Sequence, residues 1–374
     1  MSETGSTEAR APQPPSYLAR RLSACRSSIR KKALDGYLVT GRADQYYLTG
    51  FDGEDGAALI LPRRVWLLTD GRFAEEAERR CPWASTLVRE GALSEALARL
   101  VRRHRLARIG FEPAALTVGT HATFRKAIHP ARLVASPRIV EPLRVLKDAQ
   151  EIAQLRRAIE VAESAFRAVT RRVRPGMTER ELAADLQHEM IRRGATGASF
   201  PIIVAVGSHS SLPHAVPGDR KIRSGSAVLI DWGAVVGHYR SDLTRMLFVH
   251  RIPPRFERFY NCVREAQETA IRMIAPGVRM CDVDSAARDS LRQAGLDDRF
   301  THSLGHGLGL DIHEPPRLGP RVTDRLEAGM VVTVEPGVYW PGVGGVRIED
   351  DVLVTEAGCK VLSGLSKDLD TMVV

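Results

Sequence analysis

The sequence predicts an α/β protein in which a small α/β domain precedes a larger domain made of two copies of one unit. Short apolar runs alternate with helical periodicity before residue 142, and a repeat of 101 to 107 residues follows. The length of 374 residues agrees with two domains, because one domain holds about 100–200 residues. Hydrophobic residues at 44% and charged residues at 26% are typical of globular proteins. No apolar run is long enough to predict a membrane span or a membrane partner.

Residues 17–141 carry the pattern of the small α/β domain. Residues 37–40, 57–61 and 65–69 are apolar runs that end near Gly, Pro or Asp, as buried strands do. Helical periodicity follows at residues 73–80 and 93–105. This alternation predicts a domain of mixed strands and helices.

The sequence also predicts where this domain begins and ends. Residues 1–16 are rich in Ser, Thr, Ala and Pro, which predicts a disordered N-terminal tail. A boundary falls near Pro142, so that the second domain covers residues 142–374. The five cysteines are an odd number without close pairs, and with no signal pattern at the N-terminus they predict a reducing, cytoplasmic location.

Two pairs of helices form the first part of the repeat. Asp148 is placed to cap a helix through residue 173, and Thr178 with Glu181 forms a capping box for the next one. A second pair is predicted at residues 255–275 and 282–294. The matching residues that end these helices are 101 positions apart: Pro175 and Pro276, Gly176 and Gly277, Gly194 and Gly295.

The repeat continues into strands that carry carboxylates. At an offset of 104, residues 225–233 match residues 329–337, and at an offset of 107, residues 240–242 match residues 347–349. The acids aligned in this way are Asp231 with Glu335, and Asp242 with Glu349. A pseudo-two-fold axis that relates the two copies would bring these four carboxylates together at its centre.

Carboxylates in this setting need a counter-charge. Asp231 and Glu335 each follow an apolar run, and an ionised carboxylate in a buried strand is costly unless it is paired or bound to a metal. Like charges close together raise each other's pKa, and divalent cations remove that repulsion. An oxygen-rich set with imidazole suits Mn, Co, Zn or Fe, and four carboxylates can hold two ions. Salt bridges at the surface would explain one such acid better than four repeat-related ones.

Imidazoles are concentrated in residues 301–314. Three glycines within five residues argue against a helix, so the stretch predicts a glycine-rich strand that lies close to a site. His302 and His306 would then share one face of that strand, with His313 beyond them. His214, which lies just before the first acidic strand, is a weaker signal when taken by itself.

Taken together, these motifs resemble those of the pita-bread metallopeptidases, peptidase family M24. Within that family they are similar to the Xaa-Pro aminopeptidases and the Xaa-Pro dipeptidases, or prolidases. The stretches that carry the resemblance are 212–214, 230–233, 239–245, 305–314, 332–337 and 344–350, with 47–51 and 68–72 in the N-terminal part. The resemblance implies a creatinase-like domain over residues 17–141. It also implies a pita-bread catalytic domain over residues 142–374, with a curved and mainly antiparallel sheet.

The resemblance further implies a centre of two divalent metal ions, with Mn as the first choice and Co, Zn or Fe as the others. Asp231 would chelate one ion, and His306 and Glu335 would hold the second. Asp242 and Glu349 would bridge the two ions.

The remaining residues of the implied site surround the metals. His214 and His313 would position the substrate, and with Glu335 they form the implied catalytic set. His302 would line the same pocket. Arg347 would lie beside the metal ligands, or alternatively pair with Glu349 or its neighbour Asp350.

The implied reaction is hydrolysis of the bond before proline, so proline-containing peptides are the predicted partners. Arg317 follows His313 by four residues, where an Arg in some prolidases binds the C-terminal carboxylate of a dipeptide. Because 47 of the 54 basic residues are Arg, the sequence leaves both the dipeptidase and the aminopeptidase open. It also leaves open whether His209 contacts substrate. The family's N-terminal domain often packs across a dimer, which predicts a homodimer.

Other functions on the same fold fit the sequence less well. Methionine aminopeptidases generally lack a domain like residues 17–141, and creatinase works without metal, whereas this chain carries all five ligand positions. A net charge of +9 permits nucleic acid as a partner, so a metal-free nucleic-acid or chromatin-binding module is the alternative from another class. The basic residues do not cluster, and the complete ligand set favours the enzyme.

Overall fold

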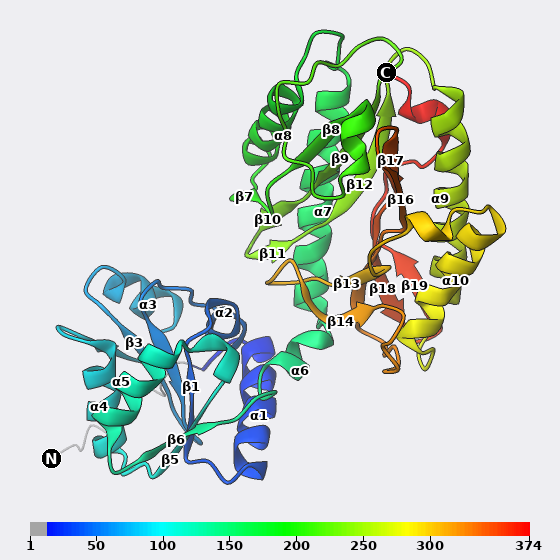
Figure 1. Ribbon diagram of the computed structural model, residues 1–374. Coiled ribbons are helices and arrows are strands. Elements are labelled where there is room, and N and C mark those ends of the chain that lie inside the picture. The colour runs from blue at the N-terminus through cyan, green and yellow to red at the C-terminus, as the bar shows by residue number, and fades with distance from the viewer. Residues whose placement is uncertain (1–12) are drawn as a thin grey trace, which may run out of the picture. The chain divides into compact units, whose positions relative to one another are not determined.

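The protein is described here by a computed structural model that covers residues 13–374. The chain forms two compact units that divide between Arg144 and Val145, within the short helix α6 (Glu141–Val145) (Figure 1). The predicted tail of residues 1–16 falls largely on residues 1–12, which lie outside the described part. Among the helices of residues 13–374, none combines the length and the hydrophobicity that a membrane crossing requires.

The first unit is a six-stranded mixed sheet with helices packed on it. The strand order is β4-β3-β2-β1-β5-β6, in which β1 pairs parallel with β5 and antiparallel with β2. The prediction of a mixed α/β domain is confirmed, with the predicted strands appearing as β1, β2 and β3. The elements are α1 (Ser16–Lys31), β1 (Gly36–Val39), α2 (Arg42–Thr49), β2 (Ala57–Ile60), β3 (Val65–Thr69), α3 (Ala74–Arg80), β4 (Ser85–Val88), α4 (Leu93–Arg103), β5 (Arg108–Phe111), η1 (Pro113–Ala115), α5 (Val118–Ile128) and β6 (Arg132–Ala135).

The second unit consists of antiparallel strands between two pairs of helices (Figure 1). Its elements are α7 (Ala149–Thr170), α8 (Glu179–Arg192), β7 (Gly197–Ala198), β8 (Ile203–Val206), η2 (Gly207–Ser211), β9 (Ala227–Trp232), β10 (Ala234–Val236), β11 (Tyr239–Arg240), β12 (Leu243–Phe248), α9 (Pro254–Met273), α10 (Met280–Gln293), η3 (Asp297–Arg299), β13 (Gly305–Gly307), β14 (Glu314–Leu318), β15 (Val331–Val334), β16 (Gly337–Trp340), β17 (Gly344–Arg347), β18 (Asp350–Thr355), β19 (Gly358–Val361) and η4 (Leu369–Met372).

The sequence repeat is a repeat of topology. In the first copy β9 pairs with β12, and the short hairpin β10–β11 connects them. In the second copy β15 pairs with β18, and the hairpin β16–β17 connects them. The two copies meet where Thr244 of β12 forms a β-bridge with Glu349, just before β18. The predicted pseudo-two-fold arrangement with a mainly antiparallel sheet is therefore confirmed.

A helix pair precedes each set of strands and buries one side of it. Helix α7 begins at a capping box of Asp148 and Glu151, and α8 begins at the predicted box of Thr178 and Glu181. The apolar sides of α7 and α8 share a core with β9, in which Phe166 stacks on Trp232. Helices α9 and α10 share a second core with the other copy. These two cores fix the strands whose ends carry the carboxylates.

One predicted element is shorter than expected. The glycine-rich stretch forms only the three-residue strand β13, which shifts register against β14 between His306 and Gly307. His302 precedes this strand in irregular backbone. The expectation that His302 and His306 share one face of a strand is therefore wrong, although both side chains reach the same cavity.

Candidate active site

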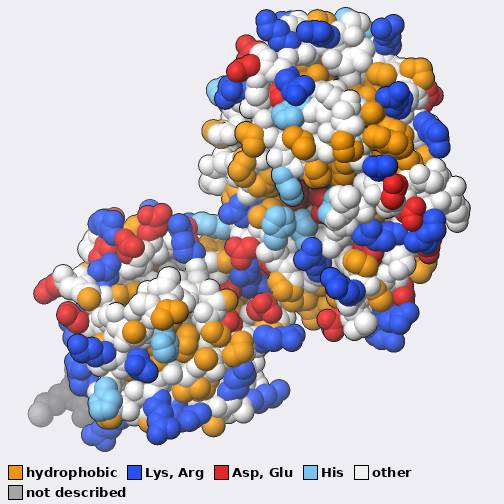
Figure 2. Space-filling model, in the orientation of Figure 1, with side chains coloured by type: hydrophobic (Ala, Val, Ile, Leu, Met, Phe, Trp, Pro, Cys, Tyr) orange, Lys and Arg blue, Asp and Glu red, His pale blue; other side chains and the backbone are white. Residues whose placement is uncertain are grey.

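A cavity of about 900 Å³ opens in the second unit, where the two copies of the repeat meet. Figure 2 shows histidine side chains gathered around a hollow on this unit. Pro201, Pro213, Pro217 and Pro315 form part of an apolar wall. The residues predicted to bind metal or substrate, together with Arg347, all line the cavity: Asp231, Asp242, His306, Glu335, Glu349, His214, His302, His313, Arg317 and Arg347.

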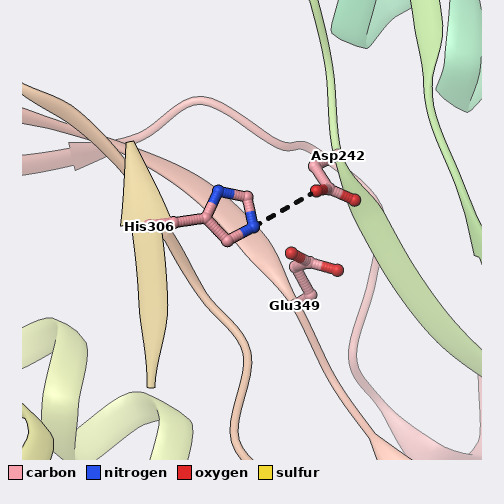
Figure 3. Close-up of side chains that lie close together, drawn as sticks. All are labelled: Asp242, His306 and Glu349. Carbon is pink, nitrogen blue, oxygen red and sulfur yellow. Dashed lines mark ion pairs between the residues drawn. The ribbon is translucent and has the colours of Figure 1, made fainter. Parts of the chain in front are cut away.

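Three of the predicted metal ligands form a compact group at the base of the cavity. Donor atoms of Asp242, His306 and Glu349 all lie within 4.8 Å of one another, as a shared metal ion requires (Figure 3). The Nε2 atom of His306 lies 3.6 Å from Asp242 Oδ2 and 3.5 Å from Glu335 Oε1. The fourth predicted ligand, Glu335, thus reaches the same imidazole from the end of β15.

Asp231, the fifth predicted ligand, is held from one side by an arginine. Its Oδ2 atom accepts a hydrogen bond of 2.5 Å from the NH2 group of Arg347. Its Oδ1 atom is buried and has no hydrogen-bond partner within residues 13–374. A buried carboxylate oxygen without a donor is costly, so this atom fits a metal ligand. The donor set of four carboxylates and one imidazole fits divalent cations that prefer oxygen and nitrogen.

The metal-free site resists ionisation of its carboxyl groups. Burial and then the charges of Glu349, Asp231 and Glu335 raise the pKa of Asp242 well above its usual range. The pKa of Glu349 rises for the same two reasons. Burial raises the pKa of Glu335 to about 8 and also raises that of Asp231. Four carboxylates at this density are ionised together only when cations compensate them.

We expect divalent metal to stabilise the protein more at pH 8 than at pH 5. Without metal, the pKa of Glu335 is about 8 in the folded state against an ordinary 4.5. Between these values the folded state binds more protons than the unfolded state, so stability falls as the pH rises. With metal, the carboxylates stay ionised and stability is instead lost as the pH falls. Melting curves with Mn²⁺ and with chelator measure this effect at each pH. A gain in melting temperature from Mn²⁺ that is the same at pH 8 as at pH 5, or smaller, would contradict the prediction.

The orientation and the protonation state of the His306 imidazole suit a metal ligand. Its Nδ1 atom lies 3.1 Å from the carbonyl oxygen of Gly307, which orients Nε2 toward the acids. Burial lowers the pKa of His306 to about 4, so the ring is neutral at pH 7. A neutral imidazole whose second nitrogen is bound to a carbonyl is the usual form of a metal-ligating histidine.

Both ring nitrogens of His302 are engaged by the protein. Nδ1 lies 2.8 Å from the carbonyl oxygen of Ser303, and Nε2 lies 3.0 Å from the hydroxyl of Tyr339. Burial lowers the pKa of His302 to about 4. A substrate contact through Nε2 would therefore have to displace Tyr339, whose hydroxyl also accepts a 2.7 Å hydrogen bond from Arg347.

Arg347 is the centre of this network. Besides Asp231 and Tyr339, its guanidinium donates from Nε to the hydroxyl of Thr244 at 3.1 Å. Within residues 13–374 its ionic partner is Asp231 rather than Glu349 or Asp350, which the sequence had offered as alternatives. Arg347 therefore lies beside the predicted metal ligand Asp231.

Two further positioning groups escaped the sequence analysis. The hydroxyl of Thr244 donates a 2.7 Å hydrogen bond to Glu349, and Asp351 accepts a 3.2 Å hydrogen bond from the backbone N–H of Asp242. Thr244 and Asp351 are 107 positions apart, the same offset as Asp242 and Glu349. Each copy of the repeat thus supports the acid of the other copy, and the repeat offset was the signal that could have found both.

The residues predicted to contact substrate lie on the cavity wall. The ring of His313 packs edge-on against His306, with centroids 4.3 Å apart. Arg317 is opposite His306 in the β13–β14 pair, and its Nε donates to Ser303 Oγ at 3.0 Å. His209 is directed elsewhere, because its Nδ1 lies 2.8 Å from a carboxylate oxygen of Glu179.

Both parts of the chain match known protein families. Residues 153–356 match the metallopeptidase family M24, and residues 21–146 match the creatinase/prolidase N-terminal domain. An uncharacterized peptidase of Bacillus subtilis is 38% identical over 349 residues, which cover 93% of this chain and 99% of that protein.

Solved structures resemble the chain over nearly its whole length. An Xaa-Pro dipeptidase from Bacillus anthracis superposes with a TM-score of 0.91 at 36% identity, covering 96% of this chain and 100% of that one. An X-Pro aminopeptidase from Thermotoga maritima reaches a TM-score of 0.88 at 33% identity, covering 93% and 100%.

Proposed function

Because the chain belongs to metallopeptidase family M24, we propose that it is a metal-dependent exopeptidase that hydrolyses the bond between an N-terminal residue and proline. One observation carries the proposal. Five donor side chains of the kind that bind two divalent cations converge on one cavity, whose wall also presents histidines, an arginine and several prolines. That cavity offers both the metal chemistry and an apolar surface for a pyrrolidine ring.

We propose that the cofactor is a pair of divalent ions, with Mn²⁺ as the preferred metal. Asp231, Asp242, His306, Glu335 and Glu349 would hold them. Bound there, the cations would polarise the scissile carbonyl and acidify the attacking water. Oxygen donors outnumber nitrogen donors by four to one, and this balance supports Mn²⁺ over softer metals.

The protein's own groups would handle the substrate and the proton. His214 and His313 would donate hydrogen bonds to the substrate carbonyl as negative charge develops on its oxygen. Glu335 would accept the proton of the attacking water through its carboxylate and return it to the proline nitrogen. Support for this role comes from the place of Glu335, whose carboxylate lines the cavity and lies 3.5 Å from Nε2 of His306.

We propose dipeptides as the preferred substrates, with Arg317 as the group that selects them. Within residues 13–374 its guanidinium uses only Nε, for Ser303. The two remaining NH2 groups are thus available for a carboxylate, and a guanidinium binds a carboxylate through two parallel hydrogen bonds. A homodimer and a cytoplasmic location remain predictions, and light scattering of the purified protein tests the first.

A small peptide panel tests the proposed function. We expect Mn²⁺-loaded protein to cleave Ala-Pro and Leu-Pro, to leave Ala-Ala intact, and to cleave Ala-Pro-Ala more slowly. Chelator should abolish cleavage, and Mn²⁺ or Co²⁺ should restore it. Arg317→Met should raise the KM for Ala-Pro about tenfold or more while changing that for Ala-Pro-Ala less, since one charge-assisted pair is worth about 1.5–3 kcal/mol.

The peptide panel, together with a nucleic-acid binding assay, also distinguishes the alternative functions. A clear preference for the tripeptide would make the protein an Xaa-Pro aminopeptidase. Cleavage of N-terminal methionine peptides without proline would point to a methionine aminopeptidase. Salt-dependent retention on DNA or RNA without any peptidase activity would favour the binding module.

A further inference from the structure

A buried glutamate outside the cavity fastens the segment that carries His214. Glu179 is the first residue of α8, and its side chain is fully buried. Its Oε1 atom accepts a 2.8 Å hydrogen bond from the backbone N–H of Val206, and its Oε2 atom accepts one of 2.9 Å from that of Gly218. One carboxylate thus binds both ends of residues 206–218.

The same carboxylate also binds the middle of this segment. Nδ1 of His209, in η2, lies 2.8 Å and 3.0 Å from the two oxygens of Glu179. Three contacts from one segment therefore converge on one side chain. Such charge-assisted hydrogen bonds, made away from water, are stronger and more directional than neutral ones at a surface.

The segment so held forms one wall of the active-site cavity. Residues 213–217, which include His214, line it. The side chain of His214 is exposed, and within residues 13–374 no hydrogen bond to its ring is present. The position of the His214 ring therefore depends on the position of the backbone that carries it. That backbone is tied to Glu179 at both ends and to Gly345 through Ser210.

We propose that Glu179 is a positioning residue of the active site: its buried carboxylate holds residues 206–218 and thereby places His214 beside the metal centre. The inference rests on the proposed function, because it assumes that His214 contacts substrate. Glu179 itself does not line the cavity and takes no part in the chemistry.

A neighbouring glutamate provides a matched control. Glu181 lies in the same first turn of α8. Among the described residues, its side chain accepts hydrogen bonds only from Thr178, at 2.7 Å from the backbone N–H and 2.9 Å from the hydroxyl. Glu179→Gln and Glu181→Gln remove the same charge from the same helix end. Glu179→Gln places an amide NH2 group where the backbone N–H groups of Val206 and Gly218 both need an acceptor, and Glu181→Gln does not. We therefore expect only Glu179→Gln to loosen residues 206–218.

Two measurements on metal-loaded protein test the inference. We expect Glu179→Gln to speed amide hydrogen exchange across residues 206–218, and Glu181→Gln to leave that segment unchanged. We expect Glu179→Gln to lower kcat/KM about 10- to 100-fold at unchanged metal content, because a displacement of about 1 Å at a catalytic group can cost about 100-fold. In a protein that already carries His214→Ala, Glu179→Gln should lower kcat/KM by less than about threefold.

The outcomes separate this inference from the proposed function. Unchanged exchange in Glu179→Gln, or an equal loss with and without His214, would overturn the inference. An inactive wild-type protein would instead contradict the proposed function, while hydrogen exchange would still decide whether Glu179 holds the segment. If Glu179→Gln does not fold, His209→Ala removes one of the three donors and should produce the same changes at smaller size.

Discussion

Asp242→Ala is expected to abolish turnover while the protein stays folded. Asp242 belongs to the compact group of donors, since its carboxylate lies within 4.8 Å of donor atoms of both His306 and Glu349. Its burial and then the charges of Glu349, Asp231, Glu335 and Asp351 raise its pKa, so without metal the ionised carboxylate is costly to the folded protein. Stability without metal is therefore expected to rise slightly, whereas kcat falls by about 1,000-fold or more, as when one member of a catalytic unit is removed.

Metal analysis and a control variant make this result interpretable. The bound metal of Asp242→Ala should fall from two ions per chain to one or none. Asp219→Ala is the control, because Asp219 is exposed and pairs only with Arg180 at the surface within the described residues. It should keep its metal and its activity. An Asp242→Ala protein that still cleaves Ala-Pro at the wild-type rate would exclude the two-metal site.

The sequence predicted most of the proposed metal ligands because the repeat places carboxylates, and not only helices and strands, at matching positions in both copies. A buried strand that ends in an acid is unusual, and two of them at a fixed offset identify Asp231 and Glu335 without a structure. The offset of 107 then adds Asp242 and Glu349. Applied two residues further, it would also have led to Thr244 and Asp351, which support these acids from the opposite copy.

What the sequence could not predict are contacts that have no local signature. Arg347 reaches Asp231 across 116 positions, and Tyr339 joins Arg347 to His302. No periodicity encodes such pairs, because they depend on how the two copies pack. The period-2 interpretation of residues 301–314 failed for a similar reason. Asp284 of α10 accepts a 3.1 Å hydrogen bond from the backbone N–H of Leu304, a long-range contact that no sequence period predicts.

Arg245→Met is expected to cause the largest loss of stability. Arg245 is fully buried in β12 and bonds to the second copy of the repeat. Its NH2 group donates to Asp350 at 2.7 Å and its NH1 group to the carbonyl oxygen of Glu349 at 2.6 Å. Within the part of the chain that the structure describes, the substitution leaves the Asp350 carboxylate with two side-chain partners, Lys367 and Gln267. Breaking a buried ion pair on one side costs about 3–5 kcal/mol.

Urea unfolding with and without metal measures this cost. Arg157→Met is the matched control, because within residues 13–374 Arg157 makes only an exposed pair with Glu160, and such pairs contribute about 0–1 kcal/mol. The double variant Arg245→Met/Asp350→Leu should recover part of the loss, since removing both partners leaves no buried charge uncompensated. Lys367 is partly exposed and can turn to water. If Arg245→Met unfolds at the same urea concentration as Arg157→Met, this arginine does not hold the two copies together.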